Sequence, residues 1–224
     1  FSDLFFIMPS GGKDFQGRGV LVHGTNTFLE TVQYEFIVNH AKKYVRNAHD
    51  LNGDTVSDLI LGMKDSFFVL WGGDYLNGTI TLDENIDPRW GVTIQGAESG
   101  FGVGDLDGNG YDDLAITLPN QKMNDNLLAG CVIFLLGQET WPQTIDVNQI
   151  LTNEFTAMNY VMVCGTEPFG NFGYSVAGVG DIQNDGFEDV IIGSPFEKLP
   201  GETNVQKAGS AYVIQGKSIF YAQQ

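Results

Sequence analysis

Short apolar runs alternate with polar, glycine-rich stretches along the chain, and this pattern predicts β-strands rather than helices. One set of runs follows directly on acidic stretches: DLILG at 58–62, DLAIT at 113–117 and DVIIG at 189–193. A second set comes later in each unit: GVLVHG at 19–24, FFVLWGG at 67–73, CVIFLLG at 131–137 and AYVIQG at 211–216. Apolar runs this short, bounded by turn residues, are typical of buried strands. The chain is therefore expected to be all-β.

An acidic pattern of nine residues precedes each run of the first set. The copies read DLNGDTVSD at 50–58, DLDGNGYDD at 105–113 and DIQNDGFED at 181–189. Oxygen-bearing side chains occupy positions 1, 3, 5 and 9, and position 7 can add a backbone carbonyl. Three carboxylates in one loop repel one another unless a hard cation lies between them, and Ca²⁺ prefers such an oxygen cage. The predicted calcium ligands are Asp50, Asn52, Asp54, Val56 and Asp58; Asp105, Asp107, Asn109, Tyr111 and Asp113; and Asp181, Gln183, Asp185, Phe187 and Asp189.

Two other kinds of structure share parts of this acidic pattern. An EF-hand needs a bidentate Glu at loop position 12 and flanking helices, but that position holds Leu61, Ile116 or Ile192, inside a predicted strand. Clusters of Asp, Asn and Gly also form turns that bind no metal. Three copies in the same register favour the metal-binding reading. The loop 105–113 is expected to be the best-formed site, because Gln183 is longer than Asp or Asn and Thr55 lacks the turn freedom of glycine.

The acidic loops define a repeat that organises the chain. Asp58 and Asp113 are 55 residues apart, Asp113 and Asp189 are 76 apart, and Asp3 lies 55 residues before Asp58, so a fourth, truncated copy is expected to end at Asp3. The expected units cover about 1–38, 39–95, 96–160 and 161–224 of one domain. A small sheet cannot bury both faces alone, so such units must stack, and radial stacking gives a propeller. A stacked solenoid is the alternative architecture.

The stretch FGNFGYSVAGVGDIQNDGFEDVIIGSP at 169–195 resembles an FG-GAP repeat, the blade unit of the integrin α-subunit β-propeller. Phe172 and Gly173 stand for the FG, and Gly193-Ser194-Pro195 stands for the GAP. The stretch GFGVGDLDGNGYDDLAITLP at 100–119 matches nearly as well, whereas the unit around 50–58 departs more, with Thr55 in place of the loop glycine and Gly62-Met63-Lys64 in place of the GAP.

The resemblance implies four-stranded antiparallel blades around a central axis, with calcium in the hairpin loop between the first two strands of some blades. At about 55 residues a blade, the chain would hold about three and a half to four blades of a partial propeller. Further blades, before Phe1 or after Gln224, or another chain, are expected to cover its open faces.

Charge and composition argue against nucleic acid as a partner and against a membrane-spanning segment. The net charge is −17, and only 11 Lys and Arg are present, so nucleic acid is not an expected partner. The longest apolar runs are too short for a membrane span. Loops of this kind fill in millimolar extracellular calcium, and Asn77-Gly78-Thr79 is an acceptor pattern for a glycan. We therefore expect an extracellular or cell-surface location and a glycoprotein.

The two cysteines, Cys131 and Cys164, leave two readings open: a bridge between neighbouring units or two buried thiols. Catalytic signatures are weak, because the near-match to a nucleophile elbow around Ser175 lacks the following helix. The predicted function is a non-enzymatic, calcium-binding adhesion or protein-interaction module, or a component of a surface assembly that contacts neighbouring subunits. The alternative is an accessory propeller of a secreted hydrolase, such as a phospholipase or a polysaccharide-degrading enzyme; a catalytic domain in the flanking sequence would favour it.

Overall fold

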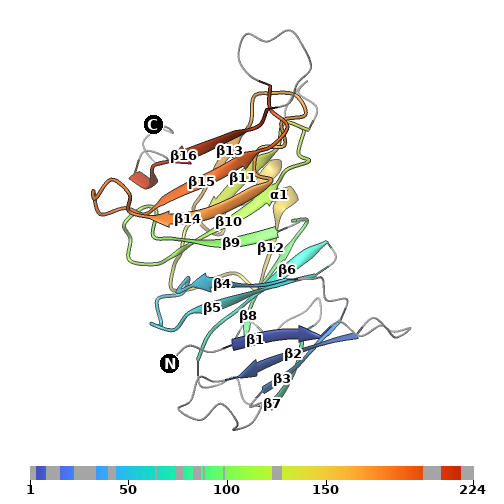
Figure 1. Ribbon diagram of the computed structural model, residues 1–224. Helices are drawn as coiled ribbons and strands as arrows, with labels where there is room; N and C mark the ends of the chain where they lie inside the picture. The colour runs from blue at the N-terminus through green and yellow to red at the C-terminus, as the bar shows by residue number, and fades with distance from the viewer. Residues whose placement is uncertain are drawn as a thin grey trace.

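The computed structural model describes residues 4–8, 16–22, 34–39, 44–63, 65–73, 78–82, 87, 89–97, 99–122, 128–198 and 208–217. Within them, sixteen strands form four sheets, and one short helix lies outside the sheets. The sheets follow one another in chain order, from the blue first sheet at one end of Figure 1 to the orange and red fourth sheet at the other. The predicted all-β class is confirmed. Asp3 and the glycan acceptor Asn77 lie outside the described residues.

The first two sheets each end in a strand that comes from the following unit. The first sheet has the order β1-β2-β3-β7 and the second the order β12-β8-β6-β5-β4. The strands of the first are β1 (Leu4–Met8), β2 (Gln16–Val22), β3 (Tyr34–Asn39) and β7 (Gly78–Leu82). Those of the second are β4 (Val45–His49), β5 (Asp58–Gly62), β6 (Ser66–Leu70), β8 (Gly91–Gln95) and β12 (Thr144–Asp146).

The third and fourth sheets are antiparallel throughout. The third has the order β13-β11-β10-β9 and the fourth the order β14-β15-β16. Their strands are β9 (Ser99–Gly104), β10 (Asp113–Leu118), β11 (Cys131–Leu135) and β13 (Tyr160–Cys164), then β14 (Ser175–Gly180), β15 (Asp189–Ser194) and β16 (Ser210–Ile214). Helix α1 (Val147–Leu151) lies between β12 and β13, and the Asp146 side chain caps it by accepting from Asn148 N–H.

The expectation of four-stranded antiparallel sheets holds for the third sheet but needs correction elsewhere. β7 pairs parallel to β3, and β12 pairs parallel to β8, which makes the second sheet five-stranded. An added strand satisfies backbone groups that an edge strand would leave unpaired. β7 lies outside the expected segment 1–38 of the first sheet, and β12 lies outside the expected segment 39–95 of the second. The third sheet ends at Cys164 in β13, beyond the expected boundary at 160.

The first strands of neighbouring sheets lie close together. β4 packs against β9, and β9 packs against β14. A Cβ on Gly102 would lie 2.5 Å from the carbonyl oxygen of Ala48, and one on Gly178 would lie 2.7 Å from that of Val103. Only glycine permits such an approach between two backbones.

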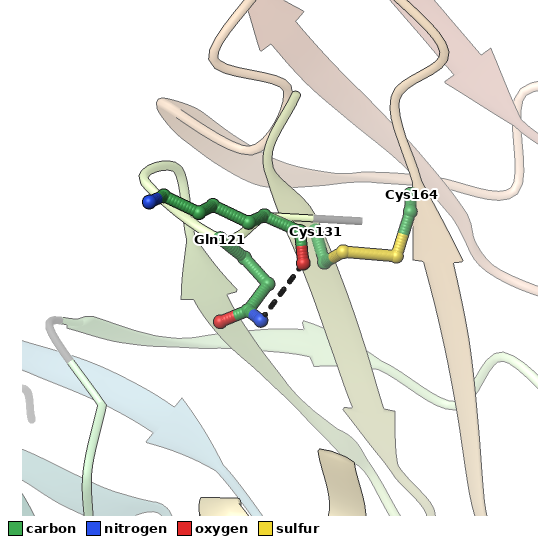
Figure 2. The surroundings of a disulfide bond; sticks show 4 residues. Gln121, Cys131 and Cys164 are labelled. Atoms are coloured by element: carbon green, nitrogen blue, oxygen red, sulfur yellow. Dashed lines mark hydrogen bonds between the residues drawn. A yellow bond between two sulfur atoms is a disulfide. The ribbon is translucent and has the colours of Figure 1, made fainter. Parts of the chain in front are cut away.

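Cys131 and Cys164 form a disulfide (Figure 2). The two residues are direct partners in the register of β11 and β13, so their Cα atoms lie only 4.0 Å apart. Gln121 lies beside the bridge and donates from its side-chain amide to the Lys122 carbonyl at 3.1 Å. The bridged reading is therefore the one that the structure supports, and the bridge joins two strands of one sheet rather than two sheets.

Candidate metal centre

The three acidic loops occupy equivalent places in the fold. They connect β4 to β5, β9 to β10 and β14 to β15, which are the first two strands of the second, third and fourth sheets. As predicted, the aspartate at position 9 begins the second strand in every case, at Asp58, Asp113 and Asp189. All three of these side chains are buried, while most other residues of the loops are partly or fully exposed.

Each position-9 carboxylate accepts two hydrogen bonds, one from its own loop and one from a glycine that follows a later strand of the same sheet. In the third sheet, Asp113 accepts from Leu106 N–H through one oxygen and from Gly137 N–H through the other, both at 2.8 Å. The same two bonds recur in the other sheets: Asp58 accepts from Leu51 and Gly72, and Asp189 from Ile182 and Gly216. Sequence reasoning missed this anchoring role, although a glycine ends the second apolar run of every unit.

The position-1 aspartate closes the turn. One oxygen of Asp105 accepts from Gly108 and Asn109 N–H, and the other accepts from Gly110 N–H. Asp50 accepts from the matching three N–H groups of its loop, and Asp181 from two. These bonds leave the chain wrapped around the carboxylate, with its remaining lone pairs free to bind a ligand.

Three carboxylates converge in the loop of the third sheet. Ligand oxygens of Asp105, Asp107 and Asp113 all lie within 4.8 Å of one another, which no other trio of His, Cys, Asp or Glu in the described ranges does. The side chain of Asn109, at position 5, is held in place by two hydrogen bonds. It accepts from Tyr111 N–H and donates to the Gly137 carbonyl. The loop predicted to be the best formed is the one whose acids lie closest together.

The other two loops keep the predicted residues but hold their side chains differently. The amide of Asn52 donates to the Asp54 carboxylate at 3.3 Å. The amide of Gln183 points at the Asp189 carboxylate, with the nitrogen 3.5 Å from its oxygen. In both loops the amide group therefore turns its nitrogen toward the neighbouring carboxylate. A side chain that binds a cation would turn its oxygen that way instead. Thr55 takes a left-handed φ of 71°, where the other loops have Gly110 and Gly186 at 90°.

Burial makes the charged forms of Asp58 and Asp113 costly. Desolvation raises the pKa of Asp113 to about 8 and that of Asp58 to about 7, against the opposing effect of the two backbone hydrogen bonds on each. Desolvation also raises the pKa of Asp107, and the neighbouring Asp105 carboxylate adds to the effect. A divalent cation among these oxygens would reverse the balance, because it stabilises the ionised carboxylates directly.

Position 7 packs against the preceding loop. The ring of Tyr111 lies over Gly53 and the ring of Phe187 over Gly108, so that a Cβ on either glycine would meet an aromatic carbon within 2.7 Å. Val56, at position 7 of the second-sheet loop, is exposed. The ligand role of the three backbone carbonyls stays a prediction. The rings give position 7 a structural role that the sequence pattern did not reveal.

No helix in the described part of the chain is long and apolar enough to cross a membrane.

Comparison with known proteins agrees with this architecture. Residues 172–214 match the family model of the FG-GAP repeat. Integrin alpha pat-2 of Caenorhabditis briggsae is 29% identical over 182 residues, which is 77% of this chain and 14% of that protein. Integrin alpha-5 of Xenopus laevis is 25% identical over 179 residues, 75% of this chain and 14% of that protein. The chain thus contains an FG-GAP repeat and is an integrin-like partial propeller.

A second kind of relative is also similar. Phosphatidylinositol-glycan-specific phospholipase D of Dictyostelium discoideum is 32% identical over 115 residues, which is 50% of this chain and 12% of that protein. The chain spans only 12% to 14% of the length of these relatives.

Proposed function

We propose that this integrin-like chain is a calcium-binding, extracellular module that presents a rigid surface to a protein partner or to neighbouring subunits of an assembly. The observation that carries the proposal is the convergence of Asp105, Asp107 and Asp113 in one loop. Calcium would lock the loop between the first two strands of a sheet. The rim of the module would then hold a fixed shape, as specific recognition requires.

The donor set fits Ca²⁺ better than the common alternatives. The site offers carboxylate and amide oxygens on a glycine-rich loop and contains no His or Cys, which argues against zinc and other softer metals. In the third-sheet loop, Asp105, Asp107, Asn109 and Asp113 would hold the ion, with the Tyr111 carbonyl. The corresponding residues of the other two loops would form weaker sites, because their amide side chains are turned toward neighbouring carboxylates.

Two features support an extracellular location. Loops that depend on a few carboxylates fill at millimolar calcium. The disulfide between Cys131 and Cys164 is a bond that oxidising compartments maintain and the cytosol reduces. Asn77 would then be open to glycosylation.

The proposed activity is binding rather than catalysis. The acids that converge in the loop are those expected of a calcium site, and Ser175, the residue of the nucleophile-elbow near-match, begins strand β14. The strongly negative charge excludes nucleic acid as a partner in this proposal.

A second candidate is an accessory propeller attached to a secreted hydrolase. The similarity to a phospholipase D over half of the chain favours it specifically. Both candidates require the same calcium loops. The sequence of the whole protein separates them, because a neighbouring catalytic domain would support the hydrolase and a stalk or anchor would support adhesion.

A heavy lanthanide soaked into crystals tests the metal site. We expect an anomalous peak among Asp105, Asp107 and Asp113 in the wild type, and a much weaker peak in Asp107→Asn. Glu154→Gln, an exposed change outside the loops, is the matched control and should leave the peak intact. Crystals with no peak in any of the three loops would overturn the proposed function.

A further inference from the structure

A pocket of about 540 Å³ lies at the outer edge of the interface between the second and third sheets. Residues of the segment 150–162 line it. This segment runs from the end of α1, which follows the edge strand β12 of the second sheet, into β13, the edge strand of the third. A volume of about 300–1,000 Å³ is usual for sites that bind small molecules. This edge pocket is therefore large enough for such a ligand.

The segment that lines the edge pocket lies where the third unit is longer than the second. Residues 83–90 connect β7 to β8 in the second unit, whereas the longer segment 147–159 connects β12 to β13 in the third. The two connections are equivalent, because β7 and β12 each pair parallel with a strand of the preceding sheet. Insertions that distinguish one repeat from its neighbours often lie on a binding face. The edge pocket thus depends on residues that the second unit lacks.

Hydrogen bonds and packing fix the shape of the edge pocket. The N–H groups of Glu154 and Phe155 both donate to the Gln149 carbonyl, at 2.8 and 3.1 Å. The Tyr160 hydroxyl donates to the side-chain oxygen of Asn153 at 3.3 Å. The Phe155 side chain is buried in the core cluster that the second and third sheets share. A lining held in place before binding loses little conformational entropy when a ligand enters.

No charged side chain lines the edge pocket. Its nine lining residues include no Asp, Glu, Lys, Arg or His, although the chain contains 28 acidic residues. A charged ligand would give up its hydration here without meeting an opposite charge, which is unfavourable. The lining therefore favours a neutral ligand.

The lining combines aromatic rings with unused polar groups. The ring centroids of Phe155 and Tyr160 lie 6.1 Å apart, and the polar residues Asn153, Thr156 and Asn159 are exposed. The side chains of Thr156 and Asn159 make no hydrogen bond to any residue that the structure describes, so their donors and acceptors are available to a ligand. A purely apolar ligand would remove these groups from water without replacing their hydrogen bonds, which is unfavourable.

A neutral sugar matches both parts of this lining. Its hydroxyl groups can pair with Thr156 and Asn159, and the C–H groups on one face of its ring can pack against an aromatic ring, whose face is partly negative. We propose that the edge pocket binds a neutral saccharide unit, a hexose or an N-acetylhexosamine. Tyr160 would supply the aromatic ring, since it is only partly buried. The site uses none of the calcium-loop residues.

Saturation-transfer NMR and titration calorimetry on the intact chain test the site, with glucose, galactose, mannose and N-acetylglucosamine as probes. We expect at least one of these sugars to bind the wild type. Thr156→Trp places a large ring at an exposed position of the lining and should weaken binding about tenfold. Asn159→Ala removes one hydrogen-bonding group and should weaken it about fivefold. The circular dichroism spectra of both variants should match that of the wild type.

Two control variants separate the edge pocket from other features. Gln149→Ala removes an exposed amide on α1 that does not line the pocket, and it should bind the sugar as the wild type does. Asp107→Asn should also bind it normally, so that loss of the calcium site and loss of the sugar site are distinguishable.

Two further probes test the chemical class of the ligand. N-acetylneuraminic acid carries a carboxylate, and N-acetyl-leucine amide imitates an apolar side chain of a protein partner; neither should bind. The proposal would be overturned if none of the four neutral sugars bound, or if Thr156→Trp and Asn159→Ala bound them as tightly as the wild type. Binding of either further probe in preference to the neutral sugars would overturn it as well.

Discussion

Asp112 and Asp50, from neighbouring sheets, are joined by two hydrogen bonds. The Asp112 carboxylate accepts from Asp50 N–H at 2.8 Å, and Asp112 N–H donates to the Asp50 carbonyl at 3.0 Å. Glu188 repeats the backbone bond one unit later, since its N–H donates to the Asp105 carbonyl at 3.0 Å. Position 8 of each of these loops therefore holds the beginning of the loop before it.

Asp112→Ala should destabilise the fold while leaving the adjacent calcium site nearly unchanged. The side chain belongs to the loop 105–113 but bonds to the preceding loop, so its loss leaves Asp50 N–H without its partner, at a cost of about 1–3 kcal/mol. Urea unfolding measures the loss of stability, and titration calorimetry measures calcium affinity. Asp113→Ala is the comparison, and it should weaken both. If Asp112→Ala weakened calcium binding as much as Asp113→Ala, the register assigned to all three loops would be wrong.

Thr55→Gly should stabilise the protein by about 1 kcal/mol. Thr55 is a β-branched residue held at a φ of 71°, a conformation that costs about 1–3 kcal/mol and that glycine adopts without strain, although glycine loses more entropy on folding. Gly110→Thr is the reciprocal change and should destabilise by a similar amount. A Cβ at Gly110 would have no neighbour within 4 Å, so that variant measures the conformational preference of the backbone without a steric clash at Cβ. Equal melting temperatures for Gly110→Thr and the wild type would contradict this account.

The metal-free protein should lose stability as pH rises from about 4 to 8. The folded-state pKa of Asp113 is raised to about 8 and that of Asp58 to about 7, from an ordinary value of 3.8. Between these values the folded state holds more protons than the unfolded state, so the stability that protonation gives is present at low pH and is lost as pH rises through the folded pKa. Calcium needs the ionised carboxylates, so its affinity should rise over the same range. Melting curves in chelator that improve from pH 5 to pH 8 would contradict the assignment.

Removing the disulfide should lower stability by about 3.5 kcal/mol. Cys131 and Cys164 are 33 residues apart in sequence, and a loop of that length restricts the unfolded chain by roughly this amount. The double variant Cys131→Ala with Cys164→Ala, unfolded in urea, measures the loss. The wild type after full reduction should match it. A double variant as stable as the wild type would show that the bridge does not form in solution.

The local features of the fold could be predicted because they depend on neighbouring residues. The acidic loops and the strands behind them follow from the nine-residue pattern, and the start of β10 at Asp113 agrees with it. The convergence of Asp105, Asp107 and Asp113 was likewise expected from the order of loop residues.

Features that depend on distant contacts could not be predicted in the same way. β7 and β12 join sheets of the preceding unit, and nothing in their short sequences distinguishes that pairing from one within their own unit. The bond from Asp113 to Gly137 links residues that only the completed sheet brings together. The disulfide depended on the register of β11 against β13, which the spacing of the cysteines does not specify.

Thermal unfolding with and without calcium tests the central claim, that a calcium ion bound by Asp105, Asp107 and Asp113 stabilises this module. At a calcium concentration a hundredfold above the dissociation constant, one site contributes about 2.7 kcal/mol, which corresponds to about 5–11 °C for a chain of this size. We expect excess chelator to lower the melting temperature by at least that much, magnesium to restore little, and Asp107→Asn to remove most of the difference. Coincident melting curves for the wild type in calcium and in chelator would contradict the claim.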